Sequence, residues 1–246
     1  MTARTVAADD AGIAEAAACL RDGGVVALPT DTVYGIAVAL STSGGVERLF
    51  HVKQRPPDKG IMLLLADAAQ APEIGVMTAA ATALGDAFWP GGLTVIVPQR
   101  PDVPFPAALT GGAPTIGLRV PDHATPRALA AAVGPLPTTS ANRSGQPEAR
   151  DAAEIAAQIG EDIDLILDGG PAHGGPASTV VDCTGEQATI LRTGAIEPAS
   201  IADVLDTARI PHALRPHVGI GRSTDGRSAA GLTTELTTEP VADEPR

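Results

Sequence analysis

Residues 25–35, VVALPTDTVYG, join a short apolar run to a cluster of polar side chains. The run at 25–30 predicts a buried strand, because strands covered on both faces read as continuous apolar stretches. The polar part holds Thr30, Asp31, Thr32 and the chain's one tyrosine, Tyr34. Strand ends in α/β sheets open onto ligand crevices, so we favour a site here. The alternative is a turn whose side chains bond to their own backbone.

The segments around this stretch have the mixed character of an α/β domain. Apolar runs predict strands, and residues of helical spacing predict helices. A loop rich in proline and glycine at 98–114 is expected to be irregular. Further strands are expected at 36–40, 61–67, 93–97, 115–123 and 163–170, with a hairpin of 176–184 and 188–194. Helices are expected at about 10–21, 46–53, 78–88, 125–132 and 151–159.

Composition excludes several classes of protein. Hydrophobic residues make up 44% of the 246 residues and charged residues 19%, as in globular proteins, and with 2% aromatic residues the core must be aliphatic. No apolar run reaches the roughly 18 residues that span a bilayer, and the N-terminus lacks a secretory signal, so a cytoplasmic protein is expected. A net charge of -12 argues against a chain-wide nucleic-acid surface.

Cysteines and histidines give no sign of a metal site. Cys19 and Cys183 lie far apart without ligand spacing and are expected to be reduced. His51, His123 and His173 also lack metal-ligand spacing. We therefore assign no metal-binding residue.

Both lysines of the chain fall in KQRPPDK, residues 53–59. The segment also carries Arg55, and the prolines at 56 and 57 hold it open after the preceding helix. A stiff cationic loop suits a polyanion such as a nucleoside triphosphate. The alternative is a solvated helix end, where cations also favour the helix dipole.

Two further segments are candidates for ligand binding. LPTTSANRSGQP, at 136–147, is interpreted as a loop of small hydroxyls and glycine, typical of anion nests but also of ordinary polar turns. Arg119 lies within an expected strand, where it faces either solvent or a cavity. Trp89, the one tryptophan, is interpreted as a core anchor.

Seven motifs together, in this order, resemble the YrdC/TsaC family of threonylcarbamoyl-AMP synthases. They are PTDTVYG, KQRPPDK, FWPGGLT, LRVPDH, TSANRSG, STVVD and ILRTG, and the resemblance covers roughly residues 10 to 196. It implies a single α/β YrdC-like domain, a twisted mixed sheet flanked by helices around a positively charged concave cavity. It also implies condensation of L-threonine, bicarbonate or CO2, and ATP into threonylcarbamoyl-AMP and pyrophosphate.

The resemblance also implies partners. ATP would bring Mg²⁺ with it. A separate transferase complex would pass the threonylcarbamoyl group to the adenosine beside the anticodon in tRNA, to which the chain itself would bind weakly at most.

Roles carry over only to the residues that match the motifs. Lys53 and Arg55 would be catalytic, through charge neutralisation at the triphosphate. The nucleotide would be bound by Lys53, Arg55, Lys59, Thr115, Ser140, Asn142 and Arg192. The substrate threonine would be bound by Thr32, Arg119, Thr138 and Ser178.

The sequence departs from the family pattern in several places. Lys59 and Gly60 replace an asparagine–proline pair, and Leu64 stands where many relatives have a histidine. Glu148 replaces a serine near the nucleotide, and PGG replaces the commoner PGP. The catalytic domain is expected at 1–197. Residues 198–246 are expected to form a short helix at 198–207 and then, from about Pro211, a disordered tail, in place of the extension domain of some relatives.

Two other functions remain open at this point. One is an RNA-binding module of the same fold without turnover, against which the charge and the few aromatic residues argue. The other is a carbamoyl-transfer domain of the hydrogenase-maturation type. Those domains accompany cysteine-rich zinc segments, whereas this chain has two cysteines.

Overall fold

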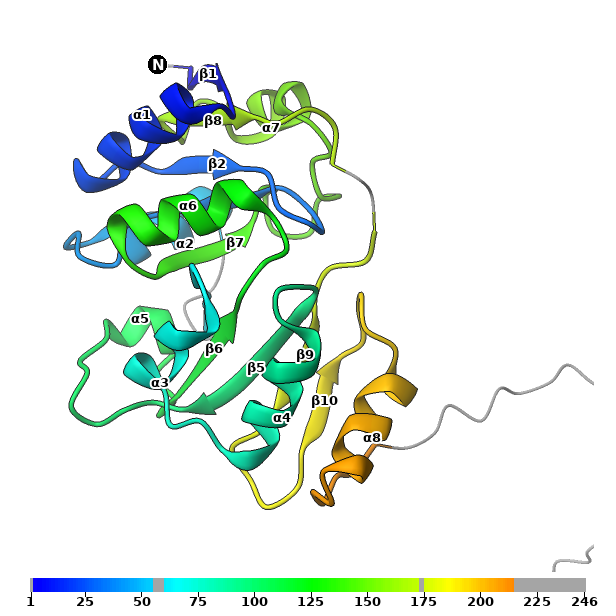
Figure 1. The fold of residues 1–246 in the computed structure, drawn as a ribbon. Coiled ribbons are helices and arrows are strands. Elements are labelled where there is room, and N and C mark those ends of the chain that lie inside the picture. The colour runs from blue at the N-terminus through cyan, green and yellow to red at the C-terminus, as the bar shows by residue number, and fades with distance from the viewer. Residues whose placement is uncertain (1, 55–59, 173–174, 215–246) are drawn as a thin grey trace, which may run out of the picture. The chain divides into compact units, whose positions relative to one another are not determined.

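The computed structural model describes residues 2–54, 60–172 and 175–214. Within these ranges ten strands form one mixed sheet in the order β1-β8-β2-β3-β7-β4-β6-β5-β9-β10 (Figure 1). The strands are β1 (Arg4–Ala7), β2 (Val26–Leu28), β3 (Gly35–Ala37), β4 (Met62–Leu64), β5 (Leu93–Pro98), β6 (Thr115–Arg119), β7 (Leu136–Ser140), β8 (Leu165–Asp168), β9 (Thr179–Asp182) and β10 (Thr189–Arg192). The expected mixed α/β sheet is therefore confirmed.

Both parallel and antiparallel pairs occur in the sheet. The neighbours β1 and β8, β8 and β2, β4 and β6, and β5 and β9 run parallel. The other neighbouring pairs are antiparallel, including the central strand β7 with β3 and with β4.

Helices cover the sheet on both faces. They are α1 (Asp10–Arg21), α2 (Gly45–Lys53), the 3-10 turn η1 (Ala68–Gln70), α3 (Ala71–Ile74), α4 (Ala79–Phe88), α5 (Ala107–Thr110), α6 (Ala124–Val133), α7 (Ala152–Ile159) and α8 (Pro198–Thr207). Helices α1 and α6 contribute to one hydrophobic cluster, and α2, α4, α7 and α8 to the other.

Alternating side chains in the central strands explain why these strands read as unbroken apolar runs. Val25 and Ala27 enter the cluster of α2 and α4, whereas Val26 and Leu28 enter the cluster of α1 and α6. The same alternation divides 63–66, where Leu64 lies on the α1 and α6 side. Because side chains on successive strand residues point to opposite faces, a sheet covered on both sides needs apolar residues at every position.

Side-chain caps begin several helices where the sequence indicated. The carboxylate of Asp9 accepts a hydrogen bond from the Gly12 N–H at the start of α1, and Asp151 accepts one from Glu154 at the start of α7. Thr78 caps α4 in the same way through Ala81. Each cap satisfies a backbone donor that the first helical turn leaves without a partner.

The structure corrects three expectations about secondary structure. Residues 136–140, expected in a polar loop, form the central strand β7 between β3 and β4. The short helix α5 interrupts the loop at 98–114. Strand β1 was not predicted at all; it pairs with β8 through Thr5 and Ile166, among others. Long-range pairing decides both strands, and local composition does not reveal it.

Helix α8 packs onto the domain. The predicted helix at 198–207 forms as expected, and its Ile201 and Leu205 are fully buried among core residues. Within the described residues, α8 therefore packs against the core of the domain expected at 1–197, and the boundary at residue 197 stays a prediction. The disorder expected from about Pro211 is wrong for residues 211–214, where the Ala188 N–H donates to the Pro211 carbonyl oxygen and the Ala213 N–H donates to the Ala188 carbonyl oxygen. The rest of the expected disorder falls on residues 215–246, outside the described ranges.

Candidate active site

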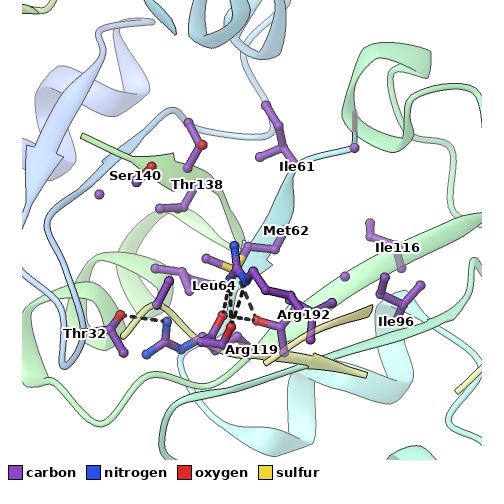
Figure 2. Close-up of a pocket in the computed structure, with 18 of the residues that line it drawn as sticks. Thr32, Ile61, Met62, Leu64, Ile96, Ile116, Arg119, Thr138, Ser140 and Arg192 are labelled. Atoms are coloured by element: carbon purple, nitrogen blue, oxygen red, sulfur yellow. Dashed lines mark hydrogen bonds between the residues drawn. The ribbon is translucent and has the colours of Figure 1, made fainter. Parts of the chain in front are cut away.

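A cavity of about 440 Å³ lies over the middle of the sheet, a size typical of small-molecule sites. Leu64 belongs both to its wall and to the hydrophobic cluster under α1 and α6, so the cavity opens on that face of the sheet. Figure 2 shows Ile96 and Ile116 on the side of the cavity away from Thr32. The walls include Thr32, Leu64, Thr94, Thr115, Arg119, Thr138, Ser140, Glu148, Ser178 and Arg192.

The strands place these side chains by their period of two. Thr138 and Ser140 are alternate residues of β7, and Thr115, Gly117 and Arg119 are alternate residues of β6; all five line the cavity. Strand β6 therefore resolves the open question about Arg119, whose side chain faces the cavity and is 2% exposed.

Arg119 is held by three hydrogen bonds. Its Nε donates to the Gly91 carbonyl oxygen (3.0 Å), Nη1 to Thr32 Oγ1 (3.1 Å) and Nη2 to Asp31 Oδ1 (2.6 Å). Figure 2 shows the side chains of Thr32 and Arg119 pointing toward each other. Thr32 is thus fixed by the same guanidinium that a ligand would meet.

The charge of Arg119 is balanced from two directions. Burial lowers the pKa of Arg119 from its ordinary value, and the nearby charge of Arg192 acts in the same direction. The carboxylate of Asp31 opposes both effects through its charge and its hydrogen bond. Arginine nevertheless stays charged in proteins, so the site contains a buried cation with one carboxylate partner in the ion pair.

Ser178 and Arg192 form a second cluster. The Arg192 guanidinium donates through Nε and Nη2 to the Ser178 carbonyl oxygen (3.0 and 2.8 Å), and Nη2 also reaches Ser178 Oγ (3.0 Å). Ser178 Oγ lies 2.9 Å from Thr94 Oγ1, and both side chains are buried. Arg192 therefore fixes the position of the serine hydroxyl at the cavity wall.

An irregularity in β10 directs Arg192 toward the cavity. Its pairing with β9 shifts register between Ile190 and Arg192. Ile190 packs against the hydrophobic core, whereas Arg192 lines the cavity. In a regular strand these two residues would share a face, and a bulge that reverses the alternation separates them.

Lys53 lies in a third cluster, behind the cavity wall. It is 4% exposed, and its Nζ donates to the Ser140 carbonyl oxygen (2.7 Å) and to Asn142 Oδ1 (2.7 Å). Ser140 Oγ also donates to Asn142 Oδ1 (2.7 Å). Ser140 lines the cavity, but Lys53 and Asn142 are not among its described lining residues. Arg55 and Lys59, the other expected cations, lie outside the described ranges.

A comparison with models of known protein families identifies the family of this chain. The family model Sua5_yciO_yrdC, described as telomere recombination, matches residues 18–194. The chain belongs to the Sua5/YciO/YrdC family.

Relatives of this chain carry one activity in their names. The threonylcarbamoyl-AMP synthase of Bacillus subtilis is 36% identical over 208 residues, 84% of this chain and 60% of that protein. The threonylcarbamoyl-AMP synthase of Vibrio vulnificus is 36% identical over 179 residues, 71% of this chain and 94% of that protein.

A solved structure extends the likeness to three dimensions. The crystal structure of Pyrococcus abyssi Sua5 complexed with L-threonine has a TM-score of 0.77 and 31% sequence identity, over 86% of this chain and 62% of that chain. This chain thus spans about three fifths of the Bacillus and Pyrococcus proteins. The resemblance derived from the seven motifs is confirmed.

Two of the residues expected to depart from the family pattern lie in the cavity wall. Leu64, which offers no hydrogen bond, and Glu148, which brings a negative charge, both line it. The PGG turn is tied to its neighbours, because the Gly91 N–H donates to the Val120 carbonyl oxygen and the Gly91 carbonyl oxygen accepts from Arg119 Nε. Trp89 packs against the core, as expected, and its Nε1 donates to the Leu93 carbonyl oxygen.

Sequence reasoning did not assign roles to Asp31, Tyr34 and Thr94. Asp31 pairs with Arg119, and Thr94 lies beside Ser178. The Tyr34 hydroxyl donates to the Gly170 carbonyl oxygen (2.6 Å) and accepts from the Gly169 N–H (3.1 Å), and burial raises its pKa. The polar cluster at 30–34 was the one available signal for Asp31 and Tyr34.

Metal ligands and membrane spans are both missing from the described part of the chain. Its residues contain no group of three or more histidine, cysteine, aspartate or glutamate side chains arranged to hold a metal ion. Nor does any helix within the described ranges combine the length and the apolar character needed to cross a membrane.

Proposed function

We propose that this member of the Sua5/YciO/YrdC family is an L-threonylcarbamoyladenylate synthase. It would condense L-threonine, bicarbonate and ATP to threonylcarbamoyl-AMP, pyrophosphate and water. One observation carries the proposal: a single cavity brings together Thr32, Arg119, Thr138 and Ser178 with Thr115, Ser140 and Arg192. These are seven of the eleven residues that the motifs assign to the two substrates. Related proteins named for this activity, and a relative solved with L-threonine, support it.

The threonine subsite centres on Arg119. An arginine has five N–H donors, and the three described bonds leave two for a ligand. Two N–H groups of one guanidinium match the two oxygens of a carboxylate. The hydroxyls of Thr32, Thr138 and Ser178 around it suit the polar atoms of a small amino acid.

The nucleotide subsite occupies the remaining wall. Ile61, Ile96 and Ile116 form an apolar surface that suits a purine ring, and Thr115 and Ser140 offer hydroxyls beside it. Arg192 and Lys53, with Arg55 and Lys59 of the adjoining loop, would neutralise the triphosphate. ATP binds as its magnesium complex, so Mg²⁺ would enter the site as part of that substrate. Glu148 is the one carboxylate among the described lining residues, so no protein ligand is assigned to the metal.

The chemistry needs positioning more than a protein nucleophile. The threonine amine, once deprotonated, attacks CO2 or activated bicarbonate, and a carbamate oxygen then attacks the α-phosphorus of ATP. The bond from that phosphorus to the β-phosphate bridging oxygen breaks, and pyrophosphate leaves. Cys183 is unsuited to covalent catalysis, since burial raises its pKa to about 12 and the thiol stays protonated. Catalysis would rest on aligned substrates and neutralised charge.

The deciding experiment measures pyrophosphate release from ATP and bicarbonate, with and without L-threonine. L-serine, which lacks one methyl group, serves as the matched substrate control. We expect release that requires threonine and is weaker with serine by roughly 10- to 200-fold in kcat/KM, the usual value of one methyl group in a pocket. If threonine does not stimulate release, the proposal is wrong.

The later steps of the pathway belong to the same proposal. The adenylate would be handed, in the cytoplasm, to a separate complex that modifies the adenosine next to the anticodon of tRNA. Supplying tRNA and that complex with this chain should give modified nucleoside only when threonine, bicarbonate and ATP are all present. If modified nucleoside forms without this chain, the chain is not needed for the modification and this part of the proposal is wrong.

A further inference from the structure

The ion pair of Asp31 and Arg119 lies directly behind the proposed threonine subsite. The two side chains approach to 2.6 Å and are 15% and 2% exposed. Thr30 and Thr32, on either side of Asp31, line the cavity, whereas Asp31 is not among the described lining residues. Asp31 therefore contacts the arginine without belonging to the described cavity wall.

The turn that carries Asp31 is held by its own hydroxyls. Thr30 Oγ1 donates to the Val33 carbonyl oxygen (2.6 Å) and accepts from the Thr32 N–H (3.2 Å). These bonds fix the backbone on both sides of Asp31. A carboxylate on a fixed turn can impose one orientation on the longer, more flexible arginine side chain.

Arg119 needs such an anchor, because a second guanidinium lies near it. Arg192 lines the same cavity as Arg119, and the repulsion between the two like charges lowers the pKa of Arg119. Without a carboxylate, the Arg119 side chain would be a buried, uncompensated charge and would turn toward any available anion. In the proposed enzyme those anions include both the threonine carboxylate and the triphosphate.

We propose that Asp31 is a positioning residue that fixes the rotation of the Arg119 guanidinium, so that its two remaining N–H groups face the cavity and accept the carboxylate of the amino-acid substrate. Asp31 does not touch the substrate in this scheme. The inference rests on the proposed function, because it names the part of the substrate that Arg119 receives. It predicts a selective effect on threonine, with little effect on ATP.

The test compares Asp31→Ala and Asp31→Asn with the wild type. In the alanine variant we expect kcat/KM for L-threonine to fall at least about tenfold, while KM for ATP stays within about twofold. Asparagine retains an acceptor oxygen without the charge. The fall in kcat/KM for L-threonine should therefore be smaller in Asp31→Asn than in Asp31→Ala, which is a partial rescue. The matched control is Asp164→Asn, which removes the carboxylate charge from an ion pair with Arg48 (2.8 Å) outside the cavity.

A double-mutant cycle tests whether Asp31 acts through Arg119. On an Arg119→Lys background, the further change Asp31→Ala should lower kcat/KM for L-threonine by less than about threefold. The reason is that lysine lacks the planar fork that Asp31 orients. A full tenfold penalty on that background would overturn the proposal. The proposal would also be overturned if Asp31→Ala impaired the use of threonine and of ATP equally, because a general folding defect gives that result.

Failure of the proposed function can be told apart from failure of this inference. If the wild type releases no pyrophosphate with threonine, the proposed function is wrong. Calorimetric binding of L-threonine without ATP then decides the role of Asp31: weaker binding by Asp31→Asn supports it, and equal affinity overturns it. Asparagine is nearly isosteric, so this variant also serves if Asp31→Ala does not fold.

Discussion

Lys53 is buried in the fold and is also the cation proposed to act at the triphosphate, two properties that usually belong to different residues. A cation that binds phosphate is expected at the surface, yet Lys53 is 4% exposed and its ammonium donates to Ser140 and Asn142. A buried charge is tolerated only when hydrogen bonds replace its water. Lys53 therefore holds the end of β7 in place, and its proposed role at the triphosphate would draw on a charge that the fold has already desolvated.

Replacing Lys53 with methionine separates its charge from its packing, because methionine retains most of the aliphatic stem. We expect threonine-dependent pyrophosphate release to fall by about 100-fold or more. The free energy of unfolding should fall by about 1–3 kcal/mol, since buried acceptors lose a charged donor. Kinetics and urea unfolding measure the two effects.

The control for this variant is Arg48→Met, which removes another cation from the same helix α2, one whose described partners are Asp164 and Gly23. Its kinetics should match the wild type. If a folded Lys53→Met protein turned over at the wild-type rate, Lys53 would have no catalytic role.

At the residue scale, the sequence predicted which motifs meet but not how their side chains are joined. Seven of the expected site residues line one cavity, and two more, Lys53 and Asn142, lie directly behind it. The bond from Arg119 to Asp31 spans 88 positions and that from Thr94 to Ser178 spans 84. Which residues become such partners depends on the order of strands in the sheet. The spacing of motifs along the chain does not reveal that order.

At the element scale, β7 and α8 show where local reasoning fails. β7 contains Pro137, a residue normally confined to edge strands, and ends in the hydroxyl residues Thr138, Thr139 and Ser140. It is nonetheless a central strand, and the Pro137 carbonyl oxygen accepts from the Val38 N–H (3.3 Å). Its neighbours supply the pairing that its own composition disfavours. Conversely, the helix at 198–207 was predicted, but its attachment to the core was not.

Helix α8 should contribute directly to the stability of the domain. Leu205 is fully buried, so Leu205→Ala should lower the free energy of unfolding by about 2–4 kcal/mol, through lost transfer free energy and a residual cavity. The exposed Asp203 lies on the same helix, and Asp203→Ala should change the free energy by no more than about 0.5 kcal/mol. Chemical denaturation compares the two. Equal effects would mean that α8 does not form part of the cooperative unit.

At the scale of the whole molecule, one sheet covered on both faces defines the fold, and alternating burial made this architecture readable from the chain. Apolar positions in successive strands enter opposite clusters, so strand existence was predictable wherever both faces are apolar. Strand order was not, because it depends on pairings between distant segments such as β1 with β8 and β5 with β9.

The buried thiol of Cys183 should make global stability depend on alkaline pH. Burial, assisted by the charge of Asp182, raises its pKa from 9.0 to about 12, so the folded state retains a proton that the unfolded state releases. Stability from this group is complete below about pH 9 and is lost as the pH rises toward 12, by up to about 1.4 kcal/mol per pH unit. Urea unfolding at pH 7.5, 9 and 10.5 measures the slope.

The comparison protein for this measurement is Cys183→Ala, whose free energy of unfolding should decline less steeply between pH 9 and 10.5. Cys19, whose pKa burial also raises, is present in both proteins, so its contribution cancels in the difference. Parallel slopes would show that the Cys183 thiol ionises equally in both states.

The cavity walls also determine when, during synthesis, a binding site can exist. Thr32 leaves the ribosome early, Arg119 near mid-chain, and Ser178 and Arg192 late, yet all four border the same cavity. A nascent chain that ends before β10 therefore lacks one wall, although most of its strands have already emerged. Substrates cannot template the early stages of folding, and the unpaired edge of β9 must be protected from other chains until β10 closes it.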